Sequence, residues 1–542
     1  MCGIFYLSNP ANNDVDTNEQ SEKFNAFNQI QHRGPDATNF IILKNKSVLG
    51  FHRLMVNGNN GMANQPMTLN GETYLLCNGE IYNNELLQKK YNINCNSGSD
   101  CEIILHLYEK FGFEQTIKEL DGEFAIVLVT PKNVYIARDP YGVRALYLFH
   151  DKEAGQIGVA SENKALYPLF KSRSNLLLQF PPGMIGVFDL DSLCYTSYNY
   201  YNYTNKMLES DAIHKATILE TLQTLLLNAV RKRMMCTRTL GNTLGNTSTT
   251  HEPAIGAYLS GGFDSSAIAA ILQSELKSTL ETFSIGFEGS PDLLYARKVA
   301  EHIGSTHHEY TITEEQALNA IPDVIGAIES YDITTVRAST MMYLLSKYVS
   351  KNSKVVVMFS GEGSDEASGS YRYFHNAPSK EEFQKESERL LKDLCYFDNL
   401  RADKSSAAWG LEIRVPFLDL QFLEYYMTLP SDIKTQNGLE KYILRQSVAN
   451  FLPEDILNRP KEAMSDGVSL HGRSWSTIIQ EHAVKITGIS DKIDAEKEYY
   501  LSLYKKKYAG CEEQIPYYWL PRWCGDVKDP SARVLPIYNA LV

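Results

Sequence analysis

The feature that most constrains the fold is a change of rhythm near residue 255. From this point, short apolar segments alternate with segments of helical periodicity. Because two parallel strands need a long crossover connection, usually a helix, this alternation predicts a parallel α/β sheet. Strands are expected at 255–259, 282–287, 307–311 and 354–359, and helices at 264–276 and 292–303. The region from 380 to 500 is mostly helical in pattern, and the last segment is irregular.

The first 200 residues follow a different pattern. Short apolar and β-branched runs are separated by Gly, Asn, Asp and Pro, which is typical of strands joined by turns. Such runs occur at 40–43, 74–77, 124–129 and 134–137, and helical stretches fall near 20–31 and 100–112. This part of the chain is therefore predicted to be α+β.

A chain of 542 residues is too long for a single hydrophobic core, so more than one domain is expected. The run NYYNY at 199–203 marks a boundary, and we predict domains at 1–205 and 206–542. A helix is expected at about 211–235. After it, a tandem TLGN repeat and a Thr/Ser run predict a flexible surface insertion at 236–253.

The composition excludes several classes of function. The net charge of −13 argues against a nucleic-acid partner, for which a basic stripe is expected. No apolar run approaches the ~18 residues that span a bilayer, and the N-terminus lacks the pattern of a signal peptide. The nine cysteines are scattered, which favours free thiols in a reducing compartment. We therefore expect a cytoplasmic protein with no membrane and no nucleic-acid partner.

Cys2 is the most informative single residue. It follows Met1, and a cysteine is small enough to allow the removal of Met1. Removal would leave a thiol of pKa ~8.5 and a free α-amine of pKa ~8 on one residue, so that nucleophile and base are held together. The alternative is that Cys2 is simply a small second residue.

Several further segments carry chemistry. In the N-terminal half they are QHRGPD at 31–36, HRLMV at 52–56, NGEIYN at 78–83 and GSDCE at 98–102. The loop SGGFDSS at 260–266 joins an expected strand to an expected helix, where backbone N–H groups and the helix dipole form an anion site. It is not the GxxxxGK[ST] loop of common nucleotide-binding proteins, because the lysine is missing.

The N-terminal segments together resemble the class II glutamine amidotransferases, the N-terminal-nucleophile type. The SGGFDSS loop is similar to the pyrophosphate-binding loop of N-type ATP pyrophosphatases, and segments at 331–340, 359–366, 408–419 and 461–467 resemble the asparagine synthetases. This resemblance implies a sandwich of two antiparallel sheets between helix layers, then an α/β parallel-sheet ATP pyrophosphatase domain with a helical C-terminal part. It also makes a homodimer an expectation.

For glutamine, the resemblance implies that Cys2 is the nucleophile and that the Asn78 side chain and the Gly79 N–H stabilise the oxyanion. Arg53 would bind the α-carboxylate through its forked guanidinium, and Asp100 would bind the α-ammonium. For Arg53 and Asp100 the alternative is a surface ion pair. The full implied glutamine site is Arg53, Leu54, Met55, Val56, Asn57, Asn78, Gly79, Glu80 and Asp100.

For ATP, the implied contacts are Leu259, Ser260, Gly261, Gly262, Asp264, Ser265, Ser266, Ile285, Ser360 and Gly361. Asp264 and Asp365 suit a Mg²⁺ ion that bridges phosphate oxygens. Two catalytic residues are implied: Glu362 for the adenylate and amide-forming steps, and Lys461 for the charge on the leaving pyrophosphate. Thr334 and Arg337 would hold aspartate. For Arg337 and Lys461 the alternative is a solvated charge on a loop.

Two positions depart from the family pattern. Phe263 stands where a leucine is usual, which predicts a change of packing. Ser370 stands where a glycine is usual. If position 370 needs a positive φ, a serine there costs about 1 kcal/mol.

The resemblance predicts an ATP-dependent carbon–nitrogen ligase. Glutamine would be hydrolysed at Cys2 through a glutamyl thioester, aspartate activated as β-aspartyl-AMP with release of pyrophosphate, and ammonia, carried by an internal tunnel, would displace AMP to give asparagine. Two alternatives stay open: an amidotransferase for a different carboxylate, and a non-catalytic protein that has kept the fold. If Met1 were retained, the Cys2 amine would be blocked and the N-terminal half would have no glutaminase activity.

Overall fold

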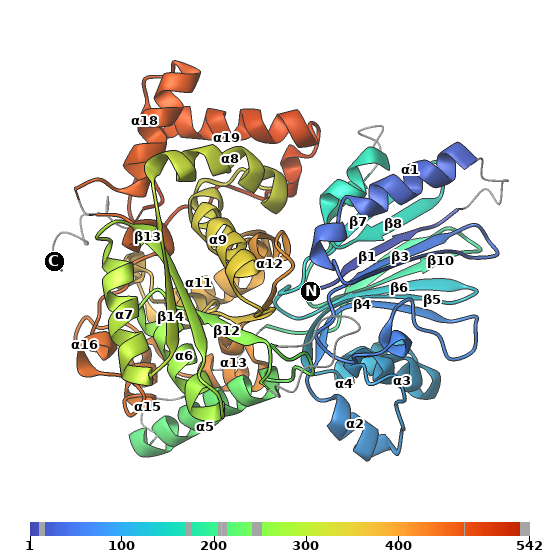
Figure 1. Ribbon diagram of the computed structural model, residues 1–542, viewed down its shortest axis with the longest axis horizontal. Helices are drawn as coiled ribbons and strands as arrows, with labels where there is room; N and C mark the ends of the chain where they lie inside the picture. The colour runs from blue at the N-terminus through green and yellow to red at the C-terminus, as the bar shows by residue number, and fades with distance from the viewer. Residues whose placement is uncertain are drawn as a thin grey trace.

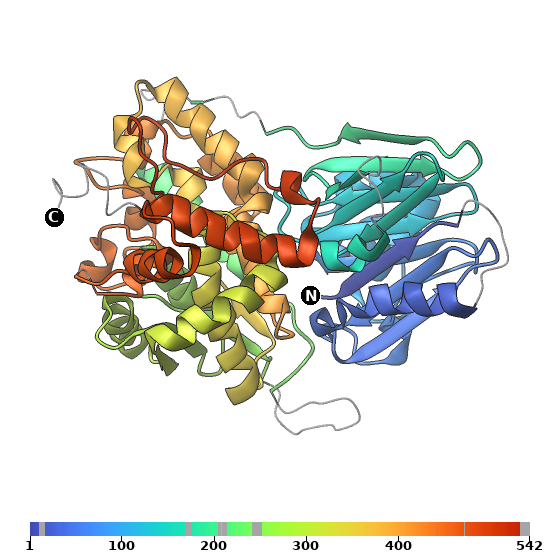
Figure 2. The ribbon, with the colours of Figure 1, turned by 90° about the horizontal axis from the view of Figure 1, so that it is seen from above.

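The computed structural model describes residues 1–9, 17–169, 176–203, 207–208, 214–240, 252–470 and 472–531. Figure 1 shows two bodies side by side: the blue and cyan strands of the first 200 residues, and the helices and green strands of the rest. The N-terminus lies between the two bodies in both views (Figures 1 and 2). The boundary at 205 and 206 stays a prediction.

The N-terminal body holds two antiparallel sheets. The first has the order β2 (Ala37–Ile42), β3 (Val48–Arg53), β1 (Gly3–Leu7), β8 (Gln156–Ala160), β7 (Tyr147–Asp151) and β9 (Leu176–Gln179). The second has the order β11 (Tyr195–Asn199), β10 (Met184–Asp189), β6 (Asn133–Arg138), β5 (Gly122–Val129) and β4 (Tyr74–Ile81).

The alternation of side chains along the strands explains the layers. In β4, Leu76 packs in the core between the two sheets, whereas its neighbour Leu75 faces the other way and packs against helices. Those helices are α2 (Asn84–Tyr91), α3 (Ile103–Phe111) and α4 (Phe113–Glu119). Helix α1 (Thr17–Asn28) covers the first sheet so closely that a Cβ on Gly50 would lie 2.6 Å from the Phe27 ring. The predicted sandwich of two sheets between helix layers is confirmed.

The second body is built on a parallel sheet, as predicted. Its order is β14 (Thr306–Ile312), β13 (Glu281–Phe287), β12 (Ile255–Tyr258), β15 (Val357–Phe359) and β16 (Glu412–Arg414), and every pairing is parallel. Strand β16 was not predicted, because two of its three residues, Glu412 and Arg414, are charged and no apolar run marks it.

Helices surround this sheet (Figure 1). Those that contact or flank it are α5 (Lys215–Arg233), α6 (Phe263–Glu275), α7 (Pro291–Ile303), α8 (Glu314–Ile328), α9 (Ile333–Asn352) and α12 (Asp398–Ala407). The helices beyond them are α10 (Ser364–Ser368), α11 (Lys380–Asp393), α13 (Leu420–Tyr426), α14 (Ser431–Lys434), α15 (Tyr442–Ser447), α16 (Glu454–Leu457), α17 (Met464–Gly467), α18 (Trp475–Thr487) and α19 (Lys492–Tyr508).

Paired charges are buried where the two bodies meet. Arg33 lies 2.9 Å from Asp403 of α12, and Glu329 accepts hydrogen bonds from the backbone N–H groups of Asn163 (2.9 Å) and Lys164 (2.7 Å). An unpaired buried charge costs several kcal/mol, so these contacts favour one docking orientation of the two bodies.

The predicted insertion at 236–253 is described at its two ends. The Leu240 N–H donates to the Glu252 carbonyl and the Ala254 N–H to the Arg238 carbonyl, both at 2.9 Å. The ends therefore pair as short antiparallel segments. Residues 241–251, which include the second half of the repeat, lie outside the described part of the chain.

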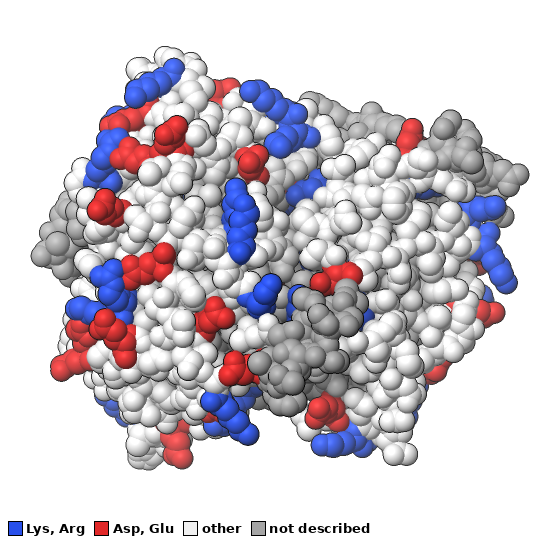
Figure 3. All heavy atoms as spheres, in the orientation of Figure 1, with Lys and Arg blue, Asp and Glu red and all other residues white. Residues whose placement is uncertain are grey.

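The surface shows no preference for one sign of charge on the face drawn in Figure 3, where acidic and basic side chains are interspersed. Within the described ranges, none of the helices combines the length and the apolar character that crossing a bilayer requires.

Two candidate active sites

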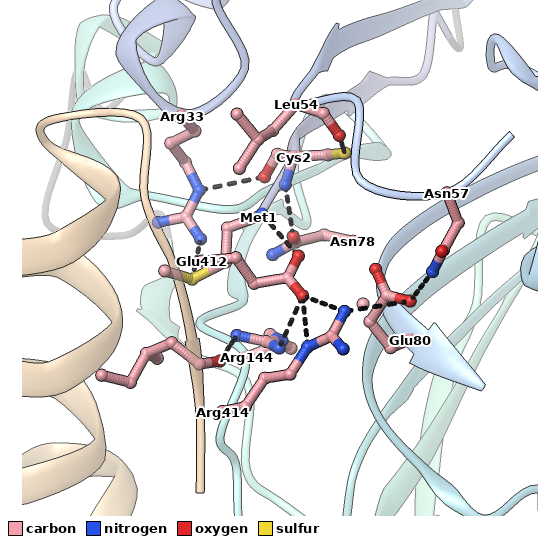
Figure 4. Close-up of polar contacts among 12 residues, drawn as sticks. Met1, Cys2, Arg33, Leu54, Asn57, Asn78, Glu80, Arg144, Glu412 and Arg414 are labelled. Carbon is pink, nitrogen blue, oxygen red and sulfur yellow. Dashed lines mark hydrogen bonds and ion pairs between the residues drawn. The ribbon is translucent and has the colours of Figure 1, made fainter. Parts of the chain in front are cut away.

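Cys2 is fixed at the junction of the two bodies by three separate segments. Its N–H donates to Asn78 Oδ1 at 2.7 Å, its carbonyl accepts from Arg33 Nε at 3.0 Å, and its Sγ lies 3.8 Å from the Leu54 carbonyl (Figure 4). Asn78 stands in β4 and Leu54 follows β3, so the two sheets together orient the thiol.

The Asn78 amide is placed as an oxyanion hole requires. Its Oδ1 is used by Cys2, but its buried Nδ2 finds no hydrogen-bond partner among the described residues. An unsatisfied buried donor is rare and costly, so one beside a nucleophile points to a group that arrives with the substrate. At Gly79, a Cβ would lie 2.0 Å from the Glu123 carbonyl oxygen. Only glycine therefore allows β4 to lie so close to β5 here.

Arg53 organises the loop that follows it, residues 54–60, which we call the glutamine loop because residues 54–57 are predicted to bind glutamine. Its guanidinium donates to the carbonyls of Asn57 (3.0 Å), Gly58 and Asn60 (2.9 Å), and to the side chain of Asn64 (2.7 Å). Arg53 is buried, so the alternative of a surface ion pair is wrong. Its role toward an α-carboxylate stays a prediction.

Two carboxylates lie beside this loop. Glu80 Oε2 accepts from the Asn57 amide at 2.5 Å, and Asp100 Oδ2 accepts from the Ile81 N–H at 2.7 Å. Burial raises the pKa of Asp100 to about 6. Asp100 is also not a surface group, because only 7% of it is exposed. Among the described residues no cation forms an ion pair with Asp100, so this buried carboxylate suits an incoming ammonium group.

Met1 blocks the Cys2 amine in this structure. The Cys2 nitrogen is an amide, and the free α-amine belongs to Met1, which forms a buried ion pair with Glu412 at 2.7 Å. Burial raises the pKa of the Cys2 thiol to about 11, and the nearby Met1 ammonium opposes this rise. The thiol is therefore protonated at neutral pH while Met1 is present.

The second site is a cavity at the carboxyl ends of β12, β13 and β15. Most of the residues predicted to bind ATP line it, namely Leu259, Ser260, Gly262, Asp264, Ser265, Ile285, Ser360 and Gly361. Gly261 and Ser266 are not among the lining residues. Gly261 (φ +70°) faces α7 instead, where a Cβ would lie 2.4 Å from the Ala296 nitrogen.

Two aspartates and two lysines converge in this cavity. Lys441 Nζ lies 2.6 Å from both Asp264 and Asp365, and Lys461 Nζ pairs with Asp365 and lies 3.8 Å from Asp264. Burial alone would raise the pKa of Asp365, but the two ammonium groups hold this pKa well below its usual range. The Asp365 carboxylate therefore stays ionised, and it converges with the Asp264 carboxylate on one location, as a shared divalent cation requires. The Lys461 side chain is 21% exposed, but its ammonium is paired with Asp365, so the alternative of a solvated loop charge is wrong for this residue.

Glu362 also lines the cavity and is oriented by Arg401 of α12. The two make a two-pronged ion pair, with Arg401 nitrogens 3.0 Å and 2.7 Å from the Glu362 oxygens. The same helix carries Asp403, which pairs with Arg33 beside Cys2. Helix α12 thus contacts both sites.

The two residues predicted to hold aspartate differ in their surroundings. Thr334 lines the cavity, and its buried hydroxyl has no partner among the described residues. Arg337 also borders the cavity, but its guanidinium is paired with Glu496 at 2.6 Å and with Asp529 at 2.8 Å. It is buried rather than solvated, and its charge is already neutralised by these two partners.

Comparisons with known proteins match both halves of the chain. A family described as "Glutamine amidotransferase domain" matches residues 1–179, and one described as "Asparagine synthase" matches residues 246–385 and 376–483. The chain is 43% identical to the asparagine synthetase [glutamine-hydrolyzing] of Gallus gallus, over 95% of this chain and 96% of that protein. The chain belongs to the glutamine-hydrolysing asparagine synthetase family. The Mus musculus member is also 43% identical, over 94% of this chain and 95% of its own length.

The departures from the asparagine synthetase pattern are explained by local packing. Phe263 is buried, and the guanidinium carbon of Arg445 lies 4.8 Å from the centre of its ring. A leucine has no ring for this contact, and the change of packing stays a prediction. Ser370 does not have a positive φ; that conformation falls to Gly369 (φ +58°). The backbone cost expected for a serine with a positive φ therefore does not arise. The Ser370 hydroxyl donates a hydrogen bond to Asp365.

Three residues of this synthetase site and its surroundings were missed in the sequence. They are Lys441, Arg401 and Glu412. Each contacts a group of the two sites that is far away along the chain: Arg401 is 39 residues from Glu362, Lys441 is 177 from Asp264, and Glu412 is 411 from Met1. Glu412 lies in the segment 408–419, but no role was predicted for it from the sequence. A buried charge could be suspected only from the tertiary contacts.

Proposed function

We propose that this chain makes asparagine from aspartate, with glutamine as the nitrogen donor and ATP as the source of activation. The observation that carries the proposal is the presence of both sites in one chain: Cys2 beside the unsatisfied Asn78 amide, and the Asp264–Asp365–lysine cluster at the end of a parallel sheet.

At the first site, removal of Met1 would free the Cys2 amine to act as a base for its own thiol. The thiolate attacks the glutamine side-chain carbonyl, and the Asn78 Nδ2 and the Gly79 N–H stabilise the oxyanion. Ammonia leaves, and water then hydrolyses the thioester to glutamate. Arg53 and Asp100 would hold the α-carboxylate and the α-ammonium of glutamine.

At the second site, an oxygen of the aspartate β-carboxylate attacks the α-phosphorus of ATP, and pyrophosphate leaves. Ammonia then attacks the acyl carbon of β-aspartyl-AMP, and AMP leaves. Lys441 and Lys461 would neutralise phosphate charge, and Glu362, held by Arg401, would move the proton lost by ammonia. Thr334 would orient the aspartate.

A Mg²⁺ ion fits the convergent carboxylates of Asp264 and Asp365. When bound, it would neutralise charge on the phosphate oxygens of ATP. Lys441 and Lys461 pair with the same two carboxylates, so they would stand beside the ion and the phosphate groups.

Neighbouring strands of the synthetase sheet connect the two sites. Glu412 of β16 contacts Met1, and β16 pairs with β15, whose end leads into Ser360 and Glu362. Ammonia set free at Cys2 would therefore enter the synthetase body at the edge of its sheet. A homodimer and a cytoplasmic location are further expectations, for size-exclusion chromatography and fractionation to test.

The test is product analysis with ATP, Mg²⁺, glutamine and aspartate. We expect asparagine, AMP and pyrophosphate in equal amounts, all dependent on aspartate. Release of glutamate without asparagine would overturn the choice of acceptor and favour another carboxylate. If fully processed protein forms neither glutamate nor asparagine, the proposed function is overturned.

A further inference from the structure

The segment that follows α5 leaves the synthetase body and lies on the glutamine loop. The N–H groups of Thr237 and Arg238 both donate to the Val56 carbonyl, at 3.1 Å and 3.0 Å. In return, the Gly58 N–H donates to the Thr237 hydroxyl at 3.1 Å. The backbone of the loop is thus hydrogen-bonded on both sides of Asn57, whose amide reaches Glu80.

Arg238 adds a charged contact behind the same loop. Its guanidinium lies 2.8 Å from Asp36 Oδ2 and 3.3 Å from the Met55 carbonyl. The same Asp36 oxygen accepts the Met55 N–H at 2.7 Å. Both side chains are mostly buried, at 15% and 17% exposure, so the ion pair is only weakly screened by solvent. Arg238 and Asp36 therefore hold both polar groups of the Met55 backbone.

The other end of the segment is anchored to the synthetase sheet. Arg414 of β16 donates to the carbonyls of Arg233 and Met235, where α5 ends, and its guanidinium also lies 3.5 Å from Glu80. The segment is therefore held by Arg414 of the synthetase sheet at one end and by the backbone of the glutamine loop at the other.

We infer that Arg238 is a positioning residue for the glutamine pocket, although it belongs to the segment that leads into the synthetase body. It acts through Asp36 on residues 55–58 and does not touch glutamine. The glutamine site is then incomplete within residues 1–205, and its shape depends on the docked synthetase half. This inference rests on the proposed glutaminase activity.

If Arg238 only stabilised the docking of the two bodies, its loss would have a different result. Such a loss would lower the stability of the protein and affect both half-reactions alike. A positioning residue changes the binding of glutamine and leaves synthesis from free ammonia unaltered, because ammonia bypasses the glutamine loop.

The test compares Arg238→Met, Arg238→Lys and the control Arg231→Met in fully processed protein. Arg231 is an arginine on α5 whose partner is Glu275 and whose side chain is 52% exposed. We expect Arg238→Met to raise the KM for glutamine about tenfold, as for the loss of one charged hydrogen bond, with little change in kcat. Arg238→Lys should recover part of this loss, and Arg231→Met should match the wild type.

Ammonia-dependent synthesis is measured on the same preparations. A wild-type KM for glutamine in Arg238→Met would overturn the inference, as would an equal loss of glutamine-dependent and ammonia-dependent synthesis. If Arg238→Met does not fold, the KM of Arg238→Lys decides, and an unchanged value overturns the inference. Failure of the proposed function is distinct, because then the wild type itself would make no asparagine from glutamine.

Discussion

The α-amine of Met1 lies 2.7 Å from a carboxylate oxygen of Glu412, and both groups are buried where the two bodies meet. Glu412 belongs to the synthetase sheet, whereas Met1 precedes the nucleophile of the other half. Several cations hold the pKa of Glu412 well below its usual range against the opposing effect of burial: the Met1 ammonium, Arg414 and Arg144. Glu412 is therefore ionised and holds the Met1 ammonium at this junction.

This contact predicts that N-terminal processing controls the glutaminase reaction. Protein that keeps Met1 should release no glutamate from glutamine, because the Cys2 nitrogen is then an amide and cannot act as a base. Intact-mass spectrometry gives the processed fraction of each preparation, and glutaminase activity should rise in proportion to it. Ammonia-dependent synthesis is the control and should not vary. Glutaminase activity in unprocessed protein would contradict the prediction.

Cys2→Ala separates the two half-reactions. We expect glutamine-dependent synthesis to fall at least ~1000-fold, since the nucleophile is lost, while synthesis from ammonium salts stays within about twofold of the wild type. The measurement is asparagine formation with each nitrogen source. Cys194→Ala is a matched control, because Cys194 is an exposed free thiol. A loss of both activities in Cys2→Ala would show that Cys2 is needed for the fold.

Asp365→Asn should disable the synthetase site alone. The carboxylate neutralises Lys441 and Lys461, and it is one of two groups suited to Mg²⁺. Synthesis from ammonia should fall at least ~100-fold, with basal release of glutamate retained. Pyrophosphate release and glutamate release, assayed separately, check the prediction. Synthesis at the wild-type rate would remove Asp365 from the proposed metal site.

The raised pKa of Asp100 predicts how glutamine binding depends on pH. Burial raises the pKa of this carboxyl to about 6, so it gains a proton as the pH falls through 6 and then loses its attraction for an ammonium group. The kcat/KM for glutamine should therefore fall below about pH 6. An Asp100→Asn variant should have a low kcat/KM that lacks this inflection. Ammonia-dependent synthesis, corrected for the free ammonia present, should not share the inflection in the wild type.

Arg337→Met distinguishes a structural role from substrate binding. Its guanidinium is buried between Glu496 and Asp529, so its removal leaves two carboxylates without their cation. We expect the free energy of unfolding to fall by about 3–5 kcal/mol, seen as a lower Tm. The control Arg297→Met removes a 52% exposed partner of Glu309. It should change the free energy of unfolding by less than about 1 kcal/mol. An unchanged Tm with a raised KM for aspartate would favour the predicted binding role.

Much of the architecture could be predicted from local patterns. The alternation of strands and helices after residue 255 indicated the parallel sheet, and short strands between turn residues indicated the N-terminal α+β fold. These patterns are local because the period of side chains along one strand or helix reflects which face is buried. Strand β16 was not found because its residues Glu412 and Arg414 are charged and their burial comes only from the tertiary structure.

The sequence by itself determined which groups can react: a cysteine at position 2, an Asn-Gly pair, a Ser/Gly loop before a helix and paired acidic residues. Only the tertiary structure decided which charges surround them. Glu412 is 411 residues from Met1, Lys441 is 177 from Asp264, and Arg238 is 202 from Asp36. Such contacts depend on how the two bodies dock, and a charge has no periodicity that marks its partner. Burial then makes these pairs strong, because little water remains to screen them.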